Sequence, residues 1–187
     1  TDFYHIAQAT ATMTPETVWV PDNFDGKYLG RITLRRALAL SRNLVSLRIV
    51  EQVGASVVAA IAKRAGVRSR LEAVPSLGLG TSEVTLLDLV RAYGTFANLG
   101  VEAAPFSVTQ ITEGASAEVL EENNPSLSVA LSPVNTYILV DMMKDVVRPG
   151  GTAGSIGRAI AHPMAGKTGT TQDNRDLWFV GFTPELT

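Results

Sequence analysis

Apolar residues recur at helical spacing along residues 33–54 and again along 85–100, which predicts a helix in each stretch. A third helix is expected over 56–66, because a glycine ends it after two basic residues that suit a helix C-terminus. A fourth begins at Ser132-Pro133 and ends at "RPGG". The side chains expected to face the core from the first and second stretches are Leu34, Leu38, Leu47, Val50 and Val53, and Leu86, Leu89, Val90, Tyr93 and Phe96.

Strand patterns occupy two other parts of the chain. Residues 106–123 are predicted to form a β-hairpin around Glu113-Gly114. The tail is predicted to form two strands, roughly 164–171 and 176–183, joined by a turn at "QDNR". In the last strand, Leu177, Phe179 and Gly181 alternate with Trp178, Val180 and Phe182. Strands that flank a long helical middle indicate an α+β fold of one domain.

Composition and charge exclude several classes of function. The 187 residues carry a net charge of −2 and no basic block, so nucleic acid is not expected as a partner. With no cysteine there is no disulfide, zinc-finger spacing or thiol nucleophile, and His5 and His162 are too few and too far apart to predict a metal site. No apolar run approaches the roughly 20 residues of a membrane span. The chain begins at Thr1 rather than methionine, so we expect it to be part of a longer protein.

Lys167 lies between small residues, and two chemistries compete for it. Ala161 to Thr168 fits a loose phosphate-loop pattern, which would predict a nucleotide-binding protein. That pattern requires a helix directly after the lysine, whereas the following "TGTTQDNRDLWFVGF" has no helical periodicity. The same residues fit a K-T-G element of serine acyl-transferases, in which the lysine lies on a strand beside a cleft. We therefore predict a strand at Lys167.

The residues around Lys167 suit an edge strand that binds an extended peptide. Thr168, Gly169 and Thr170 are small, so a ligand backbone could lie close along this strand. Lys167 would supply a cation for a terminal carboxylate, and Thr168 or Thr170 a hydroxyl.

A second polar triplet, Ser41-Arg42-Asn43, interrupts an apolar helical sequence. Serine and asparagine compete for backbone hydrogen bonds, so a local break in the helix is expected there. Ser41 could relay a proton, and Asn43 could donate to a substrate carbonyl and accept from a lysine. The alternative is that both residues only cap the junction between two helices. The active-site interpretation predicts that Ser41 and Lys167 face one another across a cleft.

Together these segments resemble the transpeptidase domain of bifunctional (class A) penicillin-binding proteins. The similar stretches are "WVPDNFDGKYLGRITLRRALALSRN", "PSLGLGTSEVTLLDLVRAYGTFANLG" and "GKTGTTQDNRDLWFVGFTPEL". The resemblance implies a serine β-lactamase/transpeptidase-like α+β fold, with an antiparallel sheet and a helical lobe. It also implies a D-alanyl-D-alanine transpeptidase that cross-links peptidoglycan stem peptides, binds β-lactams and works outside the bacterial cytoplasmic membrane, held there by an anchor outside this chain. No cofactor is implied.

The resemblance assigns roles to six residues and leaves one role unfilled. Ser41, Asn43 and Lys167 would be catalytic, and Thr168, Gly169 and Thr170 would bind substrate, with the amide of Thr170 in the oxyanion hole. No Ser-x-x-Lys occurs, because the residues three before Lys27, Lys63, Lys144 and Lys167 are Phe24, Ala60, Asp141 and Met164.

The nucleophile motif would therefore precede Thr1, and residues 1–187 would be a partial domain truncated at both ends, inactive alone. The missing motif is also compatible with one chain of a split domain and with an inactive wall-peptide-binding homologue. A serine β-lactamase is disfavoured, because its Glu-x-x-Leu-Asn sequence is absent.

Overall fold

A computed structural model describes residues 19–187 of the chain, apart from 115, 116, 161 and 172–174. His5, Ala161 and most of the predicted "QDNR" turn therefore lie outside the described residues. In chain order the elements are the helices α1 (Leu34–Ala39), α2 (Asn43–Val53) and α3 (Ala55–Ala65), the 3₁₀ helix η2 (Pro75–Leu79), α4 (Leu86–Ala97), β1 (Val101–Ala103), β2 (Gln110–Glu113), β3 (Glu118–Glu122), β4 (Leu127–Val129), α5 (Pro133–Val147), α6 (Gly154–Ala159), β5 (Ala165–Thr170) and β6 (Leu177–Phe182).

Helix ends follow the local chemistry of the sequence. The Thr85 hydroxyl accepts from the Asp88 amide and the Asp88 carboxylate accepts from the Thr85 amide, which completes a capping box at α4. The Ser132 side chain caps α5, with proline at its first position. The stretch 33–54 forms two helices, because the chain breaks between α1 and α2 as predicted. α6 was not predicted, since its six residues include two glycines.

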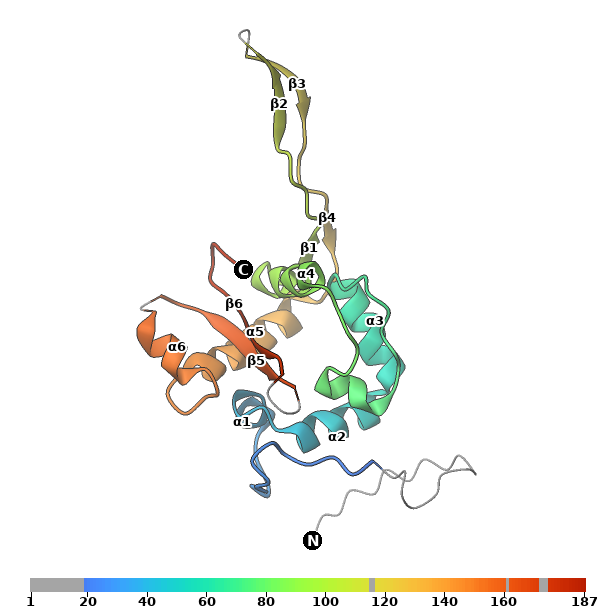
Figure 1. Cartoon of the computed structure of the whole chain (residues 1–187), viewed down its shortest axis with the longest axis vertical. Coiled ribbons are helices and arrows are strands. Elements are labelled where there is room, and N and C mark those ends of the chain that lie inside the picture. The colour runs from blue at the N-terminus through green and yellow to red at the C-terminus, as the bar shows by residue number, and fades with distance from the viewer. Residues whose placement is uncertain (1–18, 115–116, 161, 172–174) are drawn as a thin grey trace.

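The β2–β3 hairpin forms an arm that projects from the body of the molecule (Figure 1). It confirms the predicted hairpin, and every residue of both strands is exposed. The short pair β1–β4 is antiparallel and lies at the base of the arm.

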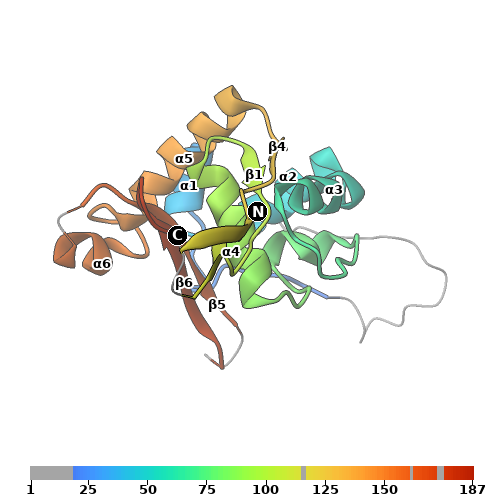
Figure 2. The same ribbon diagram turned by 90° about the horizontal axis from the view of Figure 1, so that it is seen from above.

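The tail forms the antiparallel hairpin β5–β6, with Lys167 opposite Val180 and Thr168 opposite Phe179. This confirms the two predicted strands. In both views α6 lies on one side of the hairpin and the α2–α3 pair on the other (Figure 1, Figure 2). Helices combined with small antiparallel sheets confirm the predicted α+β class.

The core consists of three small clusters that join these elements. One centres on Ala65, Val67 and Ala92, a second on Met143, Ala165 and Phe182, and a third on Val146, Val147 and Ala153. The second and third clusters pack α5 against the β5–β6 hairpin. Helix α5 therefore holds the strand that carries Lys167 in place.

Some of the predicted core positions are wrong. Leu47 and Val50 are buried, whereas Leu34, Val53, Leu86 and Val90 are exposed. Three of these four are the first or last residues of their helices, where fewer elements are in reach.

Within the described residues, no single helix is both long and apolar enough to cross a membrane. The one pair that reaches that length and composition together, α2 with α3, is bent by 99°.

Candidate active site

Ser41 occupies a backbone position that usually favours glycine. The Ser41 amide donates to the carbonyl of Leu38, and the Arg42 amide donates to that of Ala37. These two bonds end α1 in a Schellman arrangement, whose C′ residue adopts a left-handed conformation. Ser41 accordingly has a φ of 52°, which is strained for a residue with a Cβ. The helix break was predicted from side-chain competition, but it is this backbone turn that produces it.

The Ser41 hydroxyl meets Lys167 from the other end of the chain. The Lys167 Nζ donates to Ser41 Oγ at 2.7 Å and to the carbonyl of Thr168 at 2.9 Å. The prediction that Ser41 and Lys167 face one another is confirmed. Burial lowers the pKa of Lys167 from 10.5 to about 8, because an ammonium group loses hydration there. Lys167 therefore remains mainly cationic at neutral pH.

Asn43 is the first residue of α2 and lines the same groove as Lys167. Its Nδ2 donates to the carbonyl of Asp22 at 2.8 Å. No hydrogen bond joins Asn43 to Lys167 in the described part of the chain, so the expected acceptance from a lysine stays a prediction. The alternative that Ser41 and Asn43 cap the helix junction is wrong for their side chains, because Ser41 Oγ accepts from Lys167 and Asn43 Nδ2 donates to Asp22.

The loop of residues 19–30 holds the start of α2 in place. Asn23 Oδ1 accepts from the amide of Leu44, and its Nδ2 donates to the carbonyl of Lys27. The nearly buried side chain of Arg42 pairs with Asp25 at 2.6 Å. Sequence reasoning missed these supporting residues, although a charged residue inside an apolar helical stretch was a usable signal for Arg42.

The two faces of the β5–β6 hairpin have different environments. Phe179 lies across Gly166 and Gly181, so closely that a Cβ on either glycine would come within 2.8 Å of its ring. Phe179 packs onto the cluster of Val146, Val147 and Ala153. The other face carries Lys167 and Gly169 opposite Val180 and Trp178. Within the described residues β5 pairs only with β6, which leaves its second edge open.

This open edge borders a groove of about 2200 Å³. Five of the six predicted site residues line the groove, namely Asn43, Lys167, Thr168, Gly169 and Thr170. The sixth, Ser41, reaches it through its hydrogen bond to Lys167. The opposite wall includes the glycine-rich turn around η2 and the aromatic residues Trp19 and Phe24.

The strand conformation of residues 165–170 contradicts the phosphate-loop alternative. A phosphate loop places its lysine at the start of a helix, whose amides surround the ligand. Here the residues after Lys167 continue β5 to Thr170.

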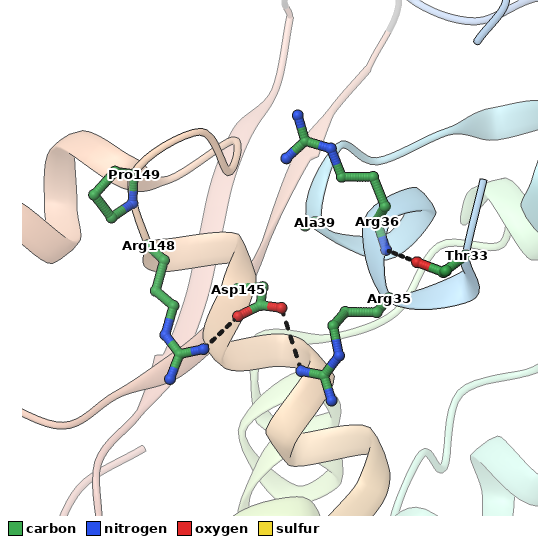
Figure 3. Close-up of a pocket in the computed structure, with 7 residues that line it drawn as sticks. All are labelled: Thr33, Arg35, Arg36, Ala39, Asp145, Arg148 and Pro149. Carbon is green, nitrogen blue, oxygen red and sulfur yellow. Dashed lines mark hydrogen bonds and ion pairs between the residues drawn. The ribbon is translucent and has the colours of Figure 1, made fainter.

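A second depression, of about 340 Å³, lies between α1 and the end of α5. Figure 3 shows Arg35 and Arg148 reaching Asp145 from opposite sides. Arg35 also pairs with Asp141 at 2.6 Å. Because the acidic partners already occupy these two guanidinium groups, the depression is an ion-paired contact that fixes α1 on α5.

Other buried charges are structural. Asp88 accepts from the Ser69 hydroxyl and from the amides of Arg68 and Ser69, and these bonds hold its pKa well below the usual range. Glu102 pairs with Arg91 at 2.5 Å. Among the described residues, no three His, Cys, Asp or Glu side chains gather as they would around a metal ion.

The fold is that of penicillin-binding protein transpeptidase domains. Penicillin-binding protein 1A from Haemophilus influenzae superposes with a TM-score of 0.81 at 23% identity, covering 91% of this chain and 31% of its own. A D,D-transpeptidase domain from Eggerthella lenta gives 0.75 at 23% identity, covering 89% and 49%.

The chain belongs to the family described as "Penicillin binding protein transpeptidase domain", whose model matches residues 6–187. It is 44% identical to penicillin-binding protein 1A of Aquifex aeolicus over 90% of this chain and 23% of the relative. It is 41% identical to penicillin-binding protein 1A of Neisseria gonorrhoeae over 91% and 22%. The chain thus spans less than a quarter of the length of these curated relatives.

Proposed function

We propose that this chain is part of a peptidoglycan D-alanyl-D-alanine transpeptidase and that it provides the Ser41–Lys167 side of the active site. The observation that carries the proposal is the 2.7 Å bond from Lys167 Nζ to Ser41 Oγ, beside the groove and the open strand edge. The nucleophilic serine and its base lysine would come from a segment that precedes Thr1 in the same domain. Residues 1–187 would accordingly be a partial domain.

The reaction would proceed through an acyl-enzyme. The nucleophilic serine attacks the carbonyl carbon of the penultimate D-alanine, and the bond to the terminal D-alanine breaks. The departing amine takes up a proton in place of the one that the nucleophilic serine loses. The amine of a neighbouring stem peptide then attacks the acyl-enzyme carbonyl, so that the new amide bond forms, the serine ester bond breaks and the serine regains a proton. A β-lactam would acylate the same serine by opening its ring amide.

The direction of the Lys167–Ser41 bond determines what Ser41 can do. Lys167 donates to Ser41 Oγ, so the Ser41 hydroxyl proton remains available to a third group. Ser41 would pass this proton to the departing amine and recover one from the incoming amine, with Lys167 keeping the oxygen in place. The cation would also stabilise the carboxylate of a ligand.

The remaining site residues would bind the ligand along β5. An extended stem peptide would lie along the open edge, where Gly169 has no side chain to obstruct it. The Thr170 amide would donate to the carbonyl oxygen on which negative charge develops, and the Thr168 and Thr170 hydroxyls would meet the ligand carboxylate. Asn43 would donate to the carbonyl of the acylated substrate once its bond to Asp22 is exchanged.

Family resemblance also supports an extracytoplasmic location, with any membrane anchor outside this chain. The partners would be peptidoglycan stem peptides and β-lactams.

Mass spectrometry with a labelled penicillin tests the proposal. The 187 residues alone should show no covalent adduct, whereas the same chain preceded by its upstream segment should be acylated at a serine in that segment. An adduct on Ser41 of the short chain would contradict the assigned roles. If the longer chain binds stem peptides without acylation, it is an inactive wall-peptide-binding homologue, and rapid turnover of the acyl-enzyme by water would identify a β-lactamase.

A further inference from the structure

Thr152 connects the two elements that carry the Ser41–Lys167 pair. It lies in the loop between α5 and α6, and its amide donates to the carbonyl of Ala39 at 3.1 Å. Its hydroxyl oxygen is 2.8 Å from that of Thr168. Ala39 is the last residue of α1, two positions before Ser41, and Thr168 directly follows Lys167.

These contacts form a closed ring. Starting from Ser41, the path follows the backbone to Ala39, crosses to Thr152, crosses to Thr168, passes to Lys167 and returns through the 2.7 Å bond to Ser41. Among the described residues, two hydrogen-bonded links therefore join the end of α1 to β5. One is the Lys167–Ser41 bond itself, and the other is Thr152.

The loop that carries Thr152 is held against α5. The Ala153 amide donates to the carbonyl of Val146, and the Gly151 amide donates to that of Arg148. A Cβ at Gly151 would collide with the carbonyl oxygen of Asp145, so the loop backbone packs directly on the helix end. Ala153 is only 2% exposed. The backbone that carries Thr152 is thus held against the end of α5, and from there Thr152 contacts both α1 and β5.

We propose that Thr152 is a positioning residue that sets the spacing between Ser41 and Lys167. Its importance for catalysis rests on the proposed function, but the spacing itself is a property of this chain. The Thr152 amide fixes the end of α1, and its hydroxyl fixes the strand at Thr168. Without the hydroxyl, the Lys167–Ser41 bond is the one hydrogen-bonded link between β5 and the end of α1 that remains among the described residues, beside the packing of Leu38 on the cluster of Met143, Ala165 and Phe182.

The environment of Lys167 provides a direct measure of this spacing. Among the described residues, no acidic side chain is hydrogen-bonded or ion-paired to Lys167, whose contacts are the Ser41 hydroxyl and the Thr168 carbonyl. Its lowered pKa comes from burial. If β5 moves away from α1, water reaches the ammonium group and the pKa of Lys167 rises.

The test uses Thr152→Val, which keeps the shape and the amide but removes the hydroxyl. Thr152→Ser restores the hydroxyl, and Thr112→Val makes the same change at another exposed position, on β2 in the projecting arm. The 187-residue chain is labelled at the lysine ε-carbon and titrated by NMR, and Lys167 is assigned from Lys167→Met. The Lys167 midpoint should rise from about 8 towards 10.5 in Thr152→Val and stay near 8 in the other two. Thermal unfolding of each variant confirms that it is folded.

An unchanged midpoint in Thr152→Val would overturn the proposal, and so would an equal shift in Thr152→Ser. No acylation is involved, so the outcome is independent of the proposed function. In the longer acylating protein, loss of one hydrogen bond should slow acylation by about fivefold, with serine restoring the rate. If the longer protein is not acylated at all, the proposed function fails while the NMR result still decides the role of Thr152.

Discussion

Lys167 and Ser41 are hydrogen-bonded at 2.7 Å, although 126 residues separate them in the chain. Because the lysine donates, the serine keeps its own proton for another group. The bond forms only when α1 and β5 are packed together, so it couples the stability of the fold to the chemistry of the site.

The first prediction concerns the pH dependence of stability. The folded pKa of Lys167 is about 8, against 10.5 for the ordinary group. Between these values the unfolded chain binds more protons at this position than the folded chain, so the contribution of Lys167 to stability rises with pH. The free energy of unfolding should be measured with urea for the wild type and for Lys167→Met. As the pH rises from about 8 to 10.5, the wild type should gain stability relative to Lys167→Met. A difference that stays constant across the window would contradict the lowered pKa.

The second prediction separates backbone strain from function at Ser41. Ser41→Gly and Ser41→Ala both remove the hydroxyl, but only glycine relieves the positive φ of 52°. The glycine variant should be more stable than the alanine variant by about 1 kcal/mol in denaturant unfolding. In the longer protein both should lose acylation activity by about 100-fold or more, the scale of a missing proton-transfer group. Equal stability of the two variants would show that position 41 is not strained.

Much of the local structure could be predicted because it is encoded within a few residues. The helix that begins after Thr85, the Ser132-Pro133 helix start and the β5–β6 alternation each depend on neighbours in sequence. The pairing of Ser41 with Lys167 was predicted from two motifs together, since the residues around Lys167 alone also fitted a phosphate loop and the Ser41–Asn43 triplet alone also fitted a helix cap.

What could not be predicted depends on contacts between distant segments. Thr152 is an ordinary threonine in sequence, and its position between Ala39 and Thr168 follows only from how the loop packs on α5. The bond from Asn43 Nδ2 to the carbonyl of Asp22 likewise follows only from how the loop of residues 19–30 packs at the start of α2. Exposure at Leu34 and Leu86 likewise depends on which elements cover a helix end, which periodicity does not record.

The third prediction concerns Asp88, which supports the fold outside the site. Hydrogen bonds led by that of the Ser69 hydroxyl hold the pKa of Asp88 well below its usual range. Asp88→Asn should destabilise the chain by about 1 to 3 kcal/mol, because the buried donors lose a charged acceptor. Glu51→Gln, a change of the same kind at an exposed position, should have little effect.

The pH dependence of Asp88 has the opposite sign to that of Lys167. A depressed folded pKa gives stability that is complete above the unfolded value, near 3.9, and is lost as the pH falls below it. The melting temperature of the wild type should therefore fall more steeply in acid than that of Asp88→Asn. If the melting temperatures of the two proteins changed with pH in parallel, Asp88 would not be the source of the acid sensitivity.

The fourth prediction uses two glycines on one strand to distinguish folding from ligand binding. A Cβ at Gly166 would lie 2.7 Å from the Phe179 ring and from the Val180 carbonyl oxygen, so Gly166→Ala should cost about 1 to 3 kcal/mol of stability. A Cβ at Gly169 would meet only the Cβ of Trp178, at 3.5 Å, which is an ordinary contact. Gly169→Ala should therefore fold normally.

The added methyl group at Gly169 would nevertheless project into the groove, on the face of β5 that carries Lys167. In the longer protein, Gly169→Ala should weaken the non-covalent step of penicillin binding by about tenfold while its melting temperature stays near that of the wild type. Gly166→Ala should show the reverse, with a lower melting temperature and near-normal binding wherever it remains folded. Normal binding by Gly169→Ala would mean that the ligand does not contact the face of β5 that carries Lys167, into which the new methyl group projects.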